Sequence, residues 1–427
     1  MQKKSLLVLL LALTLILSGC ALTRVNEEKD LARTIIDVNG ETVDKRTFVT
    51  AVNNLWNQYQ SYNQYYAQLG MEGAYPTDAD TVIKNTADTY VSTLVVRQKA
   101  HELGMFDFTD EEKAHVQEHA KEEYDSYVQQ VISTFLSDST LEGDELTAAA
   151  EAYMKEHGLS SMEDFVKDAE NEVAVEKLEE SITADVTVTD EEVTASLTEK
   201  ADAAKTQYET NPDAYGSTVN KKGTVYYAPA GYRMVKQILV GVSEEEAQAI
   251  KEARTALTTA ENAVANAAED ADMDALNAAV TEAQEKLEAV KAPALAAVKA
   301  KAEEVYGLAT AEGADFDALI AEYNTDTGMP ENGYAVREGY SLFVEEFTNA
   351  AMALKNIGDV SVPAESDYGY HIIRYEADVE EGVQDTEAVR TSIREGLLST
   401  KKNEKSTETV KSWVDAANVK LYLDKVK

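Results

Sequence analysis

Long stretches of this chain lack the residues that end helices. Only six prolines and 20 glycines interrupt its 427 residues. Long segments rich in alanine, glutamate, lysine and leucine favour helices, and apolar residues recur in them every three or four positions. The chain is therefore expected to be mainly helical, with a small strand component that makes its fold class α+β. Its length leaves room for two or more domains with a sizeable core.

A small sheet is predicted to begin the folded body. Residues 35–43 have the pattern of two short strands around the turn-forming pair Asn39 and Gly40. Thr109 and Thr189 each stand three residues before a glutamate, which is the capping-box pattern of a helix start. Helices are expected over residues 46–69, 78–103, 110–136 and 161–182.

The helical pattern breaks over residues 211–231, where prolines and glycines cluster, and this segment is the first predicted domain boundary. A buried strand is predicted next over residues 232–240, and Ser243 caps the helix after it. Two alanine-rich seams joined by a short acidic turn predict a projecting antiparallel helical hairpin over about residues 244–291. Its role is open between an arm that touches a partner and a solvated insertion without an essential role.

The first twenty residues have the form of an export signal: two lysines, an apolar run over residues 6–17 and a small-residue junction. The apolar run is too short to remain as a membrane span. Cys20, the only cysteine, stands where bacterial lipoprotein signals place the lipidated residue. Residues 1–19 are therefore interpreted as the signal peptide and residues 20–33 as a tether from an acylated Cys20, on the extracytoplasmic face of the cell membrane. An ordinary cleaved signal with an incidental cysteine is the alternative.

A formal net charge of −39 argues against nucleic acid as a partner, because phosphates demand clustered lysine and arginine. It also argues against a body that lies flat on anionic lipid, and it favours basic or unfolded chains as partners. The sequence shows neither a glycine-rich phosphate loop nor a serine nucleophile elbow. Repeated βαβ units, expected of a solute-binding lipoprotein, are not found either.

From residue 232 onward, and leaving the hairpin aside, the order is strand, helix, polar loop, short helix and closing strand. The segments that carry this pattern are residues 232–240, 313–328, 332–334, 346–354, 358–361 and 368–373. In this order they resemble a parvulin-type peptidyl-prolyl isomerase domain, with a small antiparallel sheet flanked by helices. The resemblance places that domain over residues 229–380.

The resemblance implies a site that rotates X–Pro bonds, whose barrier is ~18–20 kcal/mol, without breaking a bond. Gln237 stands where the family commonly has a second histidine, and Ala335 where a bulkier apolar residue is usual, which is expected to widen the pocket. No cofactor and no metal is implied. The implied catalytic residues are His371, Asp326 and Gln237, and the implied substrate-binding residues are Phe343, Phe347, Ala335, Ser366 and Met352.

The flanking segments resemble the PrsA and SurA-like foldases, in which a parvulin domain interrupts a helical chaperone body. Residues 38–41, 99–105, 109–112 and 186–192 carry this resemblance. It implies a discontinuous chaperone domain, in which residues 34–228 are completed by a helix and a strand within residues 381–427. The expected function is that of a membrane-anchored extracytoplasmic foldase for unfolded or newly exported proline-containing polypeptides. Whether it forms a homodimer is left open.

Two other functions remain as alternatives. In the first, the parvulin-like domain only binds peptides, and the protein is a non-catalytic holdase. In the second, His115, Glu118 and His119 match the H-x-x-E-H arrangement of a zinc metallopeptidase, although the charged residues around them indicate a solvated face.

An aromatic stripe at helical spacing is formed by Trp56, Tyr59, Tyr62 and Tyr66. Such a stripe is usually core or interhelix packing, and this is the interpretation adopted here. The alternative is a surface that grips unfolded segments, because aromatic faces bind them with little sequence preference.

Overall fold

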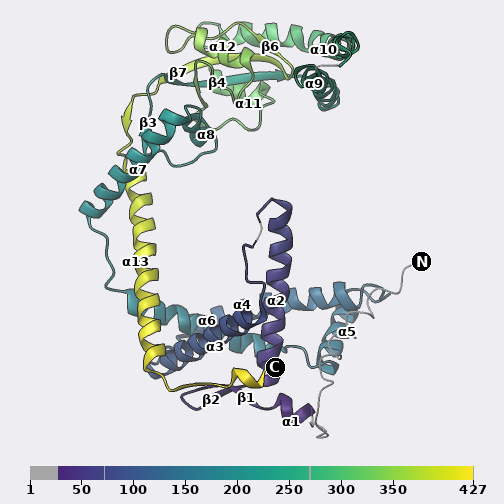
Figure 1. Cartoon of the computed structure of the whole chain (residues 1–427). Coiled ribbons are helices and arrows are strands. Elements are labelled where there is room, and N and C mark those ends of the chain that lie inside the picture. The colour runs from purple at the N-terminus through teal and green to yellow at the C-terminus, as the bar shows by residue number, and fades with distance from the viewer. Residues whose placement is uncertain (1–26, 72, 269–270, 427) are drawn as a thin grey trace. The chain divides into compact units, whose positions relative to one another are not determined.

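The computed structural model describes residues 27–71, 73–268 and 271–426, so the predicted signal, tether start and Cys20 lie outside the described residues. The described chain is mainly helical with small antiparallel sheets, which confirms the predicted fold class (Figure 1). It divides into two compact units. Unit 1 combines the chain up to Val186 with the segment from Ser399 onward, and unit 2 spans Thr187–Leu398. Among the described residues, no helix is both long enough and apolar enough to cross a membrane.

Unit 1 contains the predicted N-terminal hairpin. Asn39 and Gly40 both have positive φ, at 54° and 92°, as a tight turn between two strands requires. The sheet adds a strand from the far end of the chain, in the order β2-β1-β9, and all neighbours are antiparallel. Its strands are β1 (Thr34–Val38), β2 (Glu41–Asp44) and β9 (Val419–Leu421).

The helices of unit 1 pack on this sheet through a core that includes Ile36, Phe48 and Val91, with Trp413 of the C-terminal segment against it. The four predicted helices lie within one or two residues of their expected bounds, and the capping box at Thr109 is present. Helix α5 was not predicted. The helical elements are α1 (Glu27–Leu31), α2 (Lys45–Gln68), α3 (Ala79–Glu102), α4 (Asp110–Phe135), α5 (Gly143–Glu156), α6 (Met162–Thr183), the later part of α13 (Glu387–Ala416) and η1 (Leu423–Lys425).

The aromatic stripe of α2 is not part of a core, which corrects the packing interpretation. None of its four residues is buried, and Tyr62 is 41% exposed. Three tyrosine rings of the stripe instead gather around Tyr75, with ring centroids 5.0 to 6.0 Å apart. Helical spacing cannot distinguish a buried face from an exposed one when the side chains are amphipathic tyrosines.

Unit 2 is built on a four-stranded antiparallel sheet in the order β5-β4-β7-β6, with a separate two-stranded ladder of β3 and β8. The strands are β3 (Tyr227–Ala228), β4 (Tyr232–Gly241), β5 (Tyr334–Arg337), β6 (Ala364–Ser366), β7 (Gly369–Asp378) and β8 (Gly382–Val383). The helices are α7 (Asp190–Thr210), α8 (Ala214–Asn220), α9 (Glu244–Ala265), α10 (Met273–Ala309), α11 (Phe316–Tyr323), α12 (Glu345–Ala353) and the first part of α13.

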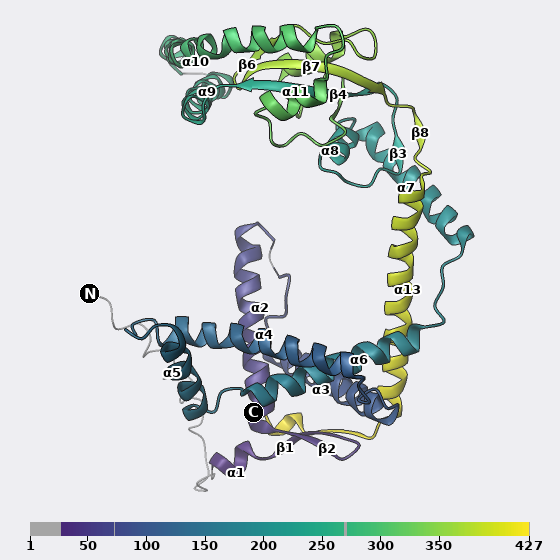
Figure 2. The same cartoon turned by 180° about the vertical axis from the view of Figure 1, so that it is seen from behind.

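Different helices pack on the two faces of the four-stranded sheet. Figure 2 shows this sheet from behind, with helices on both sides of it. On one face, Ile238 and Ile372 pack against residues of α10 and α11. On the other face, Val235 and Ile373 pack against Phe347 of α12. Because side chains alternate along a strand, Gln237 and His371 also face the α12 side.

The helical hairpin is present, but its second helix is longer than predicted. Helix α10 continues past the expected end at residue 291 and through Pro293 to Ala309 as one helix of 37 residues. Proline costs ~3 kcal/mol inside a helix. Burial of α10 residues such as Leu295 and Val305 against the sheet offsets that cost.

Unit 2 extends beyond the parvulin domain predicted over residues 229–380. Helix α8 forms within the predicted break, and Tyr215 of α8 packs with Tyr208 of α7 and with Tyr232 of β4. At the other end, Val389 and Ile393 of α13 pack against α7. The elements that flank the predicted domain on both sides therefore share its compact unit.

Candidate functional site

A cavity of about 180 Å³ opens on the α12 side of the sheet. Strands β4 and β7 form its floor, while α12 and the loops before and after β5 form its walls. Its lining residues are Gln237, Leu239, Asp326, Tyr334, Phe343, Val344, Phe347, Tyr368 and His371.

A continuous chain of hydrogen bonds runs along the polar edge of this cavity. Ser366 Oγ lies 2.7 Å from His371 Nε2, and His371 Nδ1 lies 2.7 Å from Gln237 Oε1. Gln237 Nε2 in turn donates to Asp326 Oδ2 over 2.7 Å. Ser366, His371 and Gln237 are all buried. The three implied catalytic residues thus form one connected network.

The chemistry of the partners fixes the direction of every bond in this network. Because a carboxylate only accepts, the Gln237 amide must donate to Asp326 and present its oxygen to His371. His371 therefore donates from Nδ1, and its Nε2 accepts from the Ser366 hydroxyl. Both imidazole nitrogens are engaged within the protein, so the ring faces the cavity without a free donor or acceptor.

Burial lowers the pKa of His371 to about 4, although the charge of Asp326 partly opposes the shift. The imidazole is therefore neutral at pH 7, as its place in the network requires. In the unfolded chain its pKa returns to 6.5. Between pH 6.5 and 4 the unfolded state then binds a proton that the folded state rejects, so unit 2 loses stability as the pH falls through this range.

We expect a pH-dependent loss of stability that disappears with the imidazole. A lowering from 6.5 to about 4 corresponds to about 3 kcal/mol. Urea unfolding at pH 7.5 and at pH 4.5 should show the wild-type protein losing ~2–3 kcal/mol more than His371→Asn. Both proteins carry the same carboxylates, so the change in unfolding free energy that comes from carboxylate titration cancels when the two are compared. Equal losses of unfolding free energy in the wild-type protein and in His371→Asn would contradict the conclusion that the imidazole is buried and neutral.

The Asp326 carboxylate, at the end of the network, accepts hydrogen bonds from three donors. Besides Gln237, the Tyr334 hydroxyl donates to Oδ2 over 2.8 Å, and the Gly328 N–H donates to Oδ1 over 2.9 Å. Burial, together with the bond to Asp326, raises the pKa of Tyr334, which keeps its hydroxyl protonated. The carboxylate therefore has a fixed position beside the cavity.

The apolar wall of the cavity is made of aromatic rings that meet edge to face. Phe347 lies edge-on to His371 at 5.5 Å and to Phe343 at 5.3 Å between ring centroids, and Phe343 lies 4.7 Å from Tyr334. Arg233 Nη1 donates to carbonyl oxygens at the C-terminal end of α12, which fixes the helix that carries Phe347.

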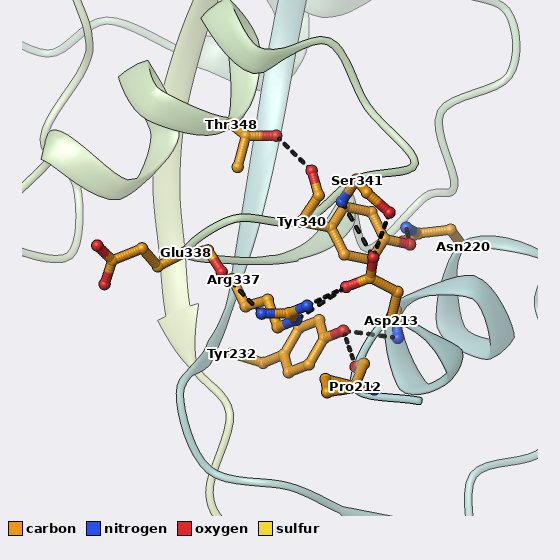
Figure 3. Close-up of polar contacts among 10 residues, drawn as sticks. Pro212, Asp213, Asn220, Tyr232, Arg337, Glu338, Tyr340, Ser341 and Thr348 are labelled. Carbon is orange, nitrogen blue, oxygen red and sulfur yellow. Dashed lines mark hydrogen bonds and ion pairs between the residues drawn. The ribbon is translucent and has the colours of Figure 1, made fainter. Parts of the chain in front are cut away.

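The loop that carries Phe343 is anchored by the segment before the sheet (Figure 3). Asp213 accepts from Arg337 Nε over 2.9 Å and from the Ser341 N–H over 3.1 Å. Asn220 pairs with the backbone of Ala335 on the edge strand β5, at 2.9 and 3.3 Å, and also donates to the Tyr340 hydroxyl. Helix α8 and the turn before it thus brace one wall of the cavity.

The predicted site residues do not all line the cavity. Phe343 and Phe347 do, and Ser366 bonds to His371 below it. Ala335 packs in a separate core on the opposite face of β5, because its neighbour Tyr334 already faces the cavity. The expectation that Ala335 widens the pocket is therefore wrong. Met352 packs against the core around Phe347 and is not a lining residue.

Tyr334, Tyr368, Leu239 and Val344 also line the cavity and were not predicted as site residues. Tyr334 and Tyr368 belong to the segments that resemble a parvulin, but nothing in the sequence assigns them a role. Leu239 could have been found from strand alternation, since it lies two residues after Gln237 and opposite His371 on β7.

The residues of the zinc-peptidase alternative lie on α4 of unit 1, where His115 is exposed and its ring centroid is 6.2 Å from that of His119. Over residues 27–71, 73–268 and 271–426, no group of three or more histidine, cysteine or acidic side chains is arranged to hold a metal ion.

Comparison with known sequences identifies a part of unit 2. The family model described as "Rotamase: PPIC-type PPIASE domain" matches residues 282–377. A foldase protein PrsA from Caldanaerobacter subterraneus subsp. tengcongensis is 35% identical over 117 residues, which cover 27% of this chain and 37% of the relative. A foldase protein PrsA 2 from Listeria monocytogenes is 38% identical over 113 residues, covering 26% and 38%. The aligned region spans little more than a third of these relatives.

Alignments with solved structures cover a larger share of this chain than the sequence alignments do. A peptidylprolyl isomerase (PrsA) from Bacillus anthracis is 18% identical and covers 77% of this chain and 94% of its own, with a TM-score of 0.17. A SurA-like chaperone of Campylobacter jejuni is 19% identical and covers 69% and 94%, with a TM-score of 0.24. On the sequence matches, the chain contains a PPIC-type parvulin domain at residues 282–377 and is homologous to foldase PrsA proteins over the 117 and 113 residues aligned with them.

Proposed function

We propose that this chain, which carries a PPIC-type peptidyl-prolyl isomerase domain, is an extracytoplasmic foldase. Unit 2 isomerises X–Pro bonds and the helical unit 1 holds unfolded clients. One observation carries the proposal: an aromatic-walled cavity lies directly beside the hydrogen-bonded network of Ser366, His371, Gln237 and Asp326. The family match over residues 282–377 supports it.

The geometry suits a reaction in which no bond breaks. Rotation about the X–Pro bond passes through a twisted amide that has lost its resonance. Water favours the planar amide, because that form carries more charge on oxygen and nitrogen. A prolyl ring seated against Phe343 and Phe347 brings its amide into an apolar space, where this stabilisation of the planar form is lost.

Asp326 adds a fixed negative charge at the edge of the cavity. The oxygen of a planar amide is partly negative, and rotation reduces that charge. A carboxylate beside the oxygen therefore disfavours the planar forms more than the twisted one, which lowers the barrier. The donors Gln237, Tyr334 and Gly328 hold the carboxylate in place for this role.

His371 acts as the centre of the network and as part of the cavity wall. Both of its nitrogens are engaged, so it exchanges no proton with the substrate. Isomerisation needs no proton transfer. For this reason Gln237, at a position that is often histidine in the family, is compatible with turnover: it supplies one acceptor to His371 and one donor to Asp326.

The holding function is assigned to the C-terminal end of α2 and the residues that follow it, up to Met71. Residues 47–71 contain no charged side chain and no histidine, in a chain of net charge −39. Tyr65 is 57% exposed, Leu69 58% and Met71 57%. An uncharged surface of tyrosines and amides suits extended client chains of varied sequence, because its contacts are adaptable and do not select charge.

Anchoring at a membrane is part of the proposal and is supported by the sequence pattern of residues 3–20. Acylation of Cys20 would hold the soluble body at the extracytoplasmic surface, since each buried acyl CH₂ contributes ~0.8 kcal/mol.

The holdase is the second candidate, because an imidazole with both nitrogens engaged would also suit a site that only binds. Refolding of a client limited by proline isomerisation separates the two. We expect catalytic amounts of the full chain to accelerate the slow refolding phase, which otherwise takes tens of seconds or longer. Suppressed aggregation with an unchanged slow phase would instead establish the holdase.

A further inference from the structure

The helical hairpin of α9 and α10 is fastened to the turn that holds two residues of the site. This turn joins β6 to β7, and Ser366 pairs with Gly369 across it. At its tip, Asp367 accepts two hydrogen bonds from Arg254 of α9, at 2.7 and 2.9 Å. Lys291 of α10 lies 2.8 Å from the same carboxylate.

Two of the three side chains in this contact are largely sheltered from solvent. The side chain of Asp367 is 21% exposed and that of Lys291 is 16% exposed, whereas Arg254 is 46% exposed. Burial works against the charge of Asp367, but the bonds from Arg254 and Lys291 hold its pKa below the ordinary value. An ion pair of this kind depends on having both partners in place, unlike a pair on an open surface.

The residues on either side of Asp367 belong to the site. Ser366 is fully buried, donates to His371 Nε2 and accepts from the Tyr368 N–H over 3.1 Å. Tyr368 lines the cavity. A shift of the turn therefore moves a hydrogen-bond partner of His371 and a wall of the cavity together.

The helices of the hairpin pack against each other, and one of them packs on the sheet. Its two helices pack along their length through Ile250 and Leu257 of α9 and Ala283 and Leu287 of α10. Helix α10 then continues without interruption onto the face of the sheet opposite His371. Arg254 of α9 and Lys291 of α10 thus belong to a pair of helices, of which α10 packs on the sheet itself. Figure 1 shows α9 and α10 side by side.

We propose that Asp367, clamped by Arg254 and Lys291, is a positioning residue of the isomerase site and that the helical hairpin serves to hold the Ser366–Tyr368 turn. The hairpin is then part of the machinery that shapes the cavity and not a passive insertion. The expected effect on kcat/KM rests on the proposed function. The expected effect on the hydrogen bond between Ser366 and His371 does not, and it can be measured independently.

The test uses the full chain and four variants. Asp367→Asn removes the charge at constant size, while Arg254→Gln and Lys291→Gln each remove one partner. The matched control is Lys286→Gln, since Lys286 pairs with Glu282 on the same α10 but at an exposed place, with side chains 68% and 67% exposed. The readouts are kcat/KM on a proline-containing peptide and the imidazole ¹⁵N resonances of His371.

We expect Asp367→Asn to lower kcat/KM by about tenfold, because small misplacements at a site have large kinetic effects. The His371 Nε2 resonance should move as the Ser366 bond loosens. Arg254→Gln and Lys291→Gln should change both readouts in the same direction by smaller amounts, and Lys286→Gln should change neither. The two partner variants keep the test decisive if Asp367→Asn does not fold.

A folded Asp367→Asn variant with wild-type His371 resonances and wild-type kcat/KM would overturn the inference. So would an equal loss in Lys286→Gln, which would show a nonspecific effect of charge on the hairpin. If the wild-type protein proves inactive, the proposed function fails, and the resonance of His371 still decides whether Asp367 positions the turn.

Discussion

His371→Ala is expected to lower kcat/KM for isomerisation of an X–Pro peptide by about 100-fold, in the range found when one preorganised polar group is removed from an active site. Without the imidazole, Gln237 Oε1 loses its donor and Ser366 Oγ loses its acceptor, so the amide that fixes Asp326 is free to turn. The wall beside Phe347 also opens to water. The measurement is the isomerisation rate of a short peptide with the full chain.

The matched control for this variant is His115→Ala, on the exposed face of α4 in unit 1. It should leave isomerisation unchanged, whereas the metallopeptidase alternative predicts that it abolishes zinc binding. Ser366→Ala, which removes one bond of His371, should give a smaller loss in the same direction. A folded His371→Ala variant that keeps more than half of the wild-type rate would contradict the role of the network.

Phe347→Ala is expected to destabilise unit 2 by ~3–5 kcal/mol, the usual cost of removing a buried phenylalanine ring. Phe347 is 2% exposed and packs edge-on against Phe343, Tyr334 and His371. The variant therefore loses both the core on the α12 face and the wall against which a prolyl ring would sit. Peptide binding should weaken together with stability.

In this experiment, the stability of unit 1 serves as the reference for the stability of unit 2. Both tryptophans, Trp56 and Trp413, lie in unit 1, so their fluorescence follows unit 1 while hydrogen exchange of β7 amides follows unit 2. Urea should unfold β7 at lower concentration in Phe347→Ala and leave the tryptophan transition in place. Phe135→Ala, at a position 55% exposed on α4, is the control and should cost well under ~1 kcal/mol at β7. A loss below ~1 kcal/mol at β7 in Phe347→Ala would contradict the packing described here.

Elements that a few neighbouring residues specify could be predicted from the sequence. The capping boxes at Thr109, Thr189 and Ser243 each start a helix where expected, and the turn at Asn39 and Gly40 joins two strands as predicted. Each of these signals is a local hydrogen-bonding or backbone preference that acts within four residues. Packing elsewhere in the chain does not have to be known.

Features that depend on distant packing could not be predicted. Pro293 lacks a backbone N–H and its ring crowds the preceding turn, so it favours the end of a helix. Helix α10 nevertheless continues, because its later residues are buried on the sheet. The stripe tyrosines of α2 have the spacing of a core face, but none of them is buried. In both cases the outcome is decided by whether a second element covers the helix, and periodicity alone carries no information on that.

For the site, the resemblance named His371, Gln237 and Asp326, and the structure shows that they are bonded in series. It could not supply the register of β5, which turns Tyr334 toward the cavity and Ala335 away from it. Nor could it join Asp367 to Arg254, which lies 113 positions away in the sequence. Cross-strand register and long-range ion pairs arise from the assembled fold and leave no local pattern.

The most direct test of the central claim is an NMR exchange experiment on the full chain with a peptide that contains one proline. With catalytic amounts of protein, we predict exchange cross-peaks between the cis and trans signals at mixing times far shorter than the uncatalysed tens of seconds. The cross-peaks should weaken strongly in His371→Ala. Peptide signals that shift or broaden on binding, with no exchange between the two isomers, would contradict the claim that the cavity beside His371 is an isomerase site.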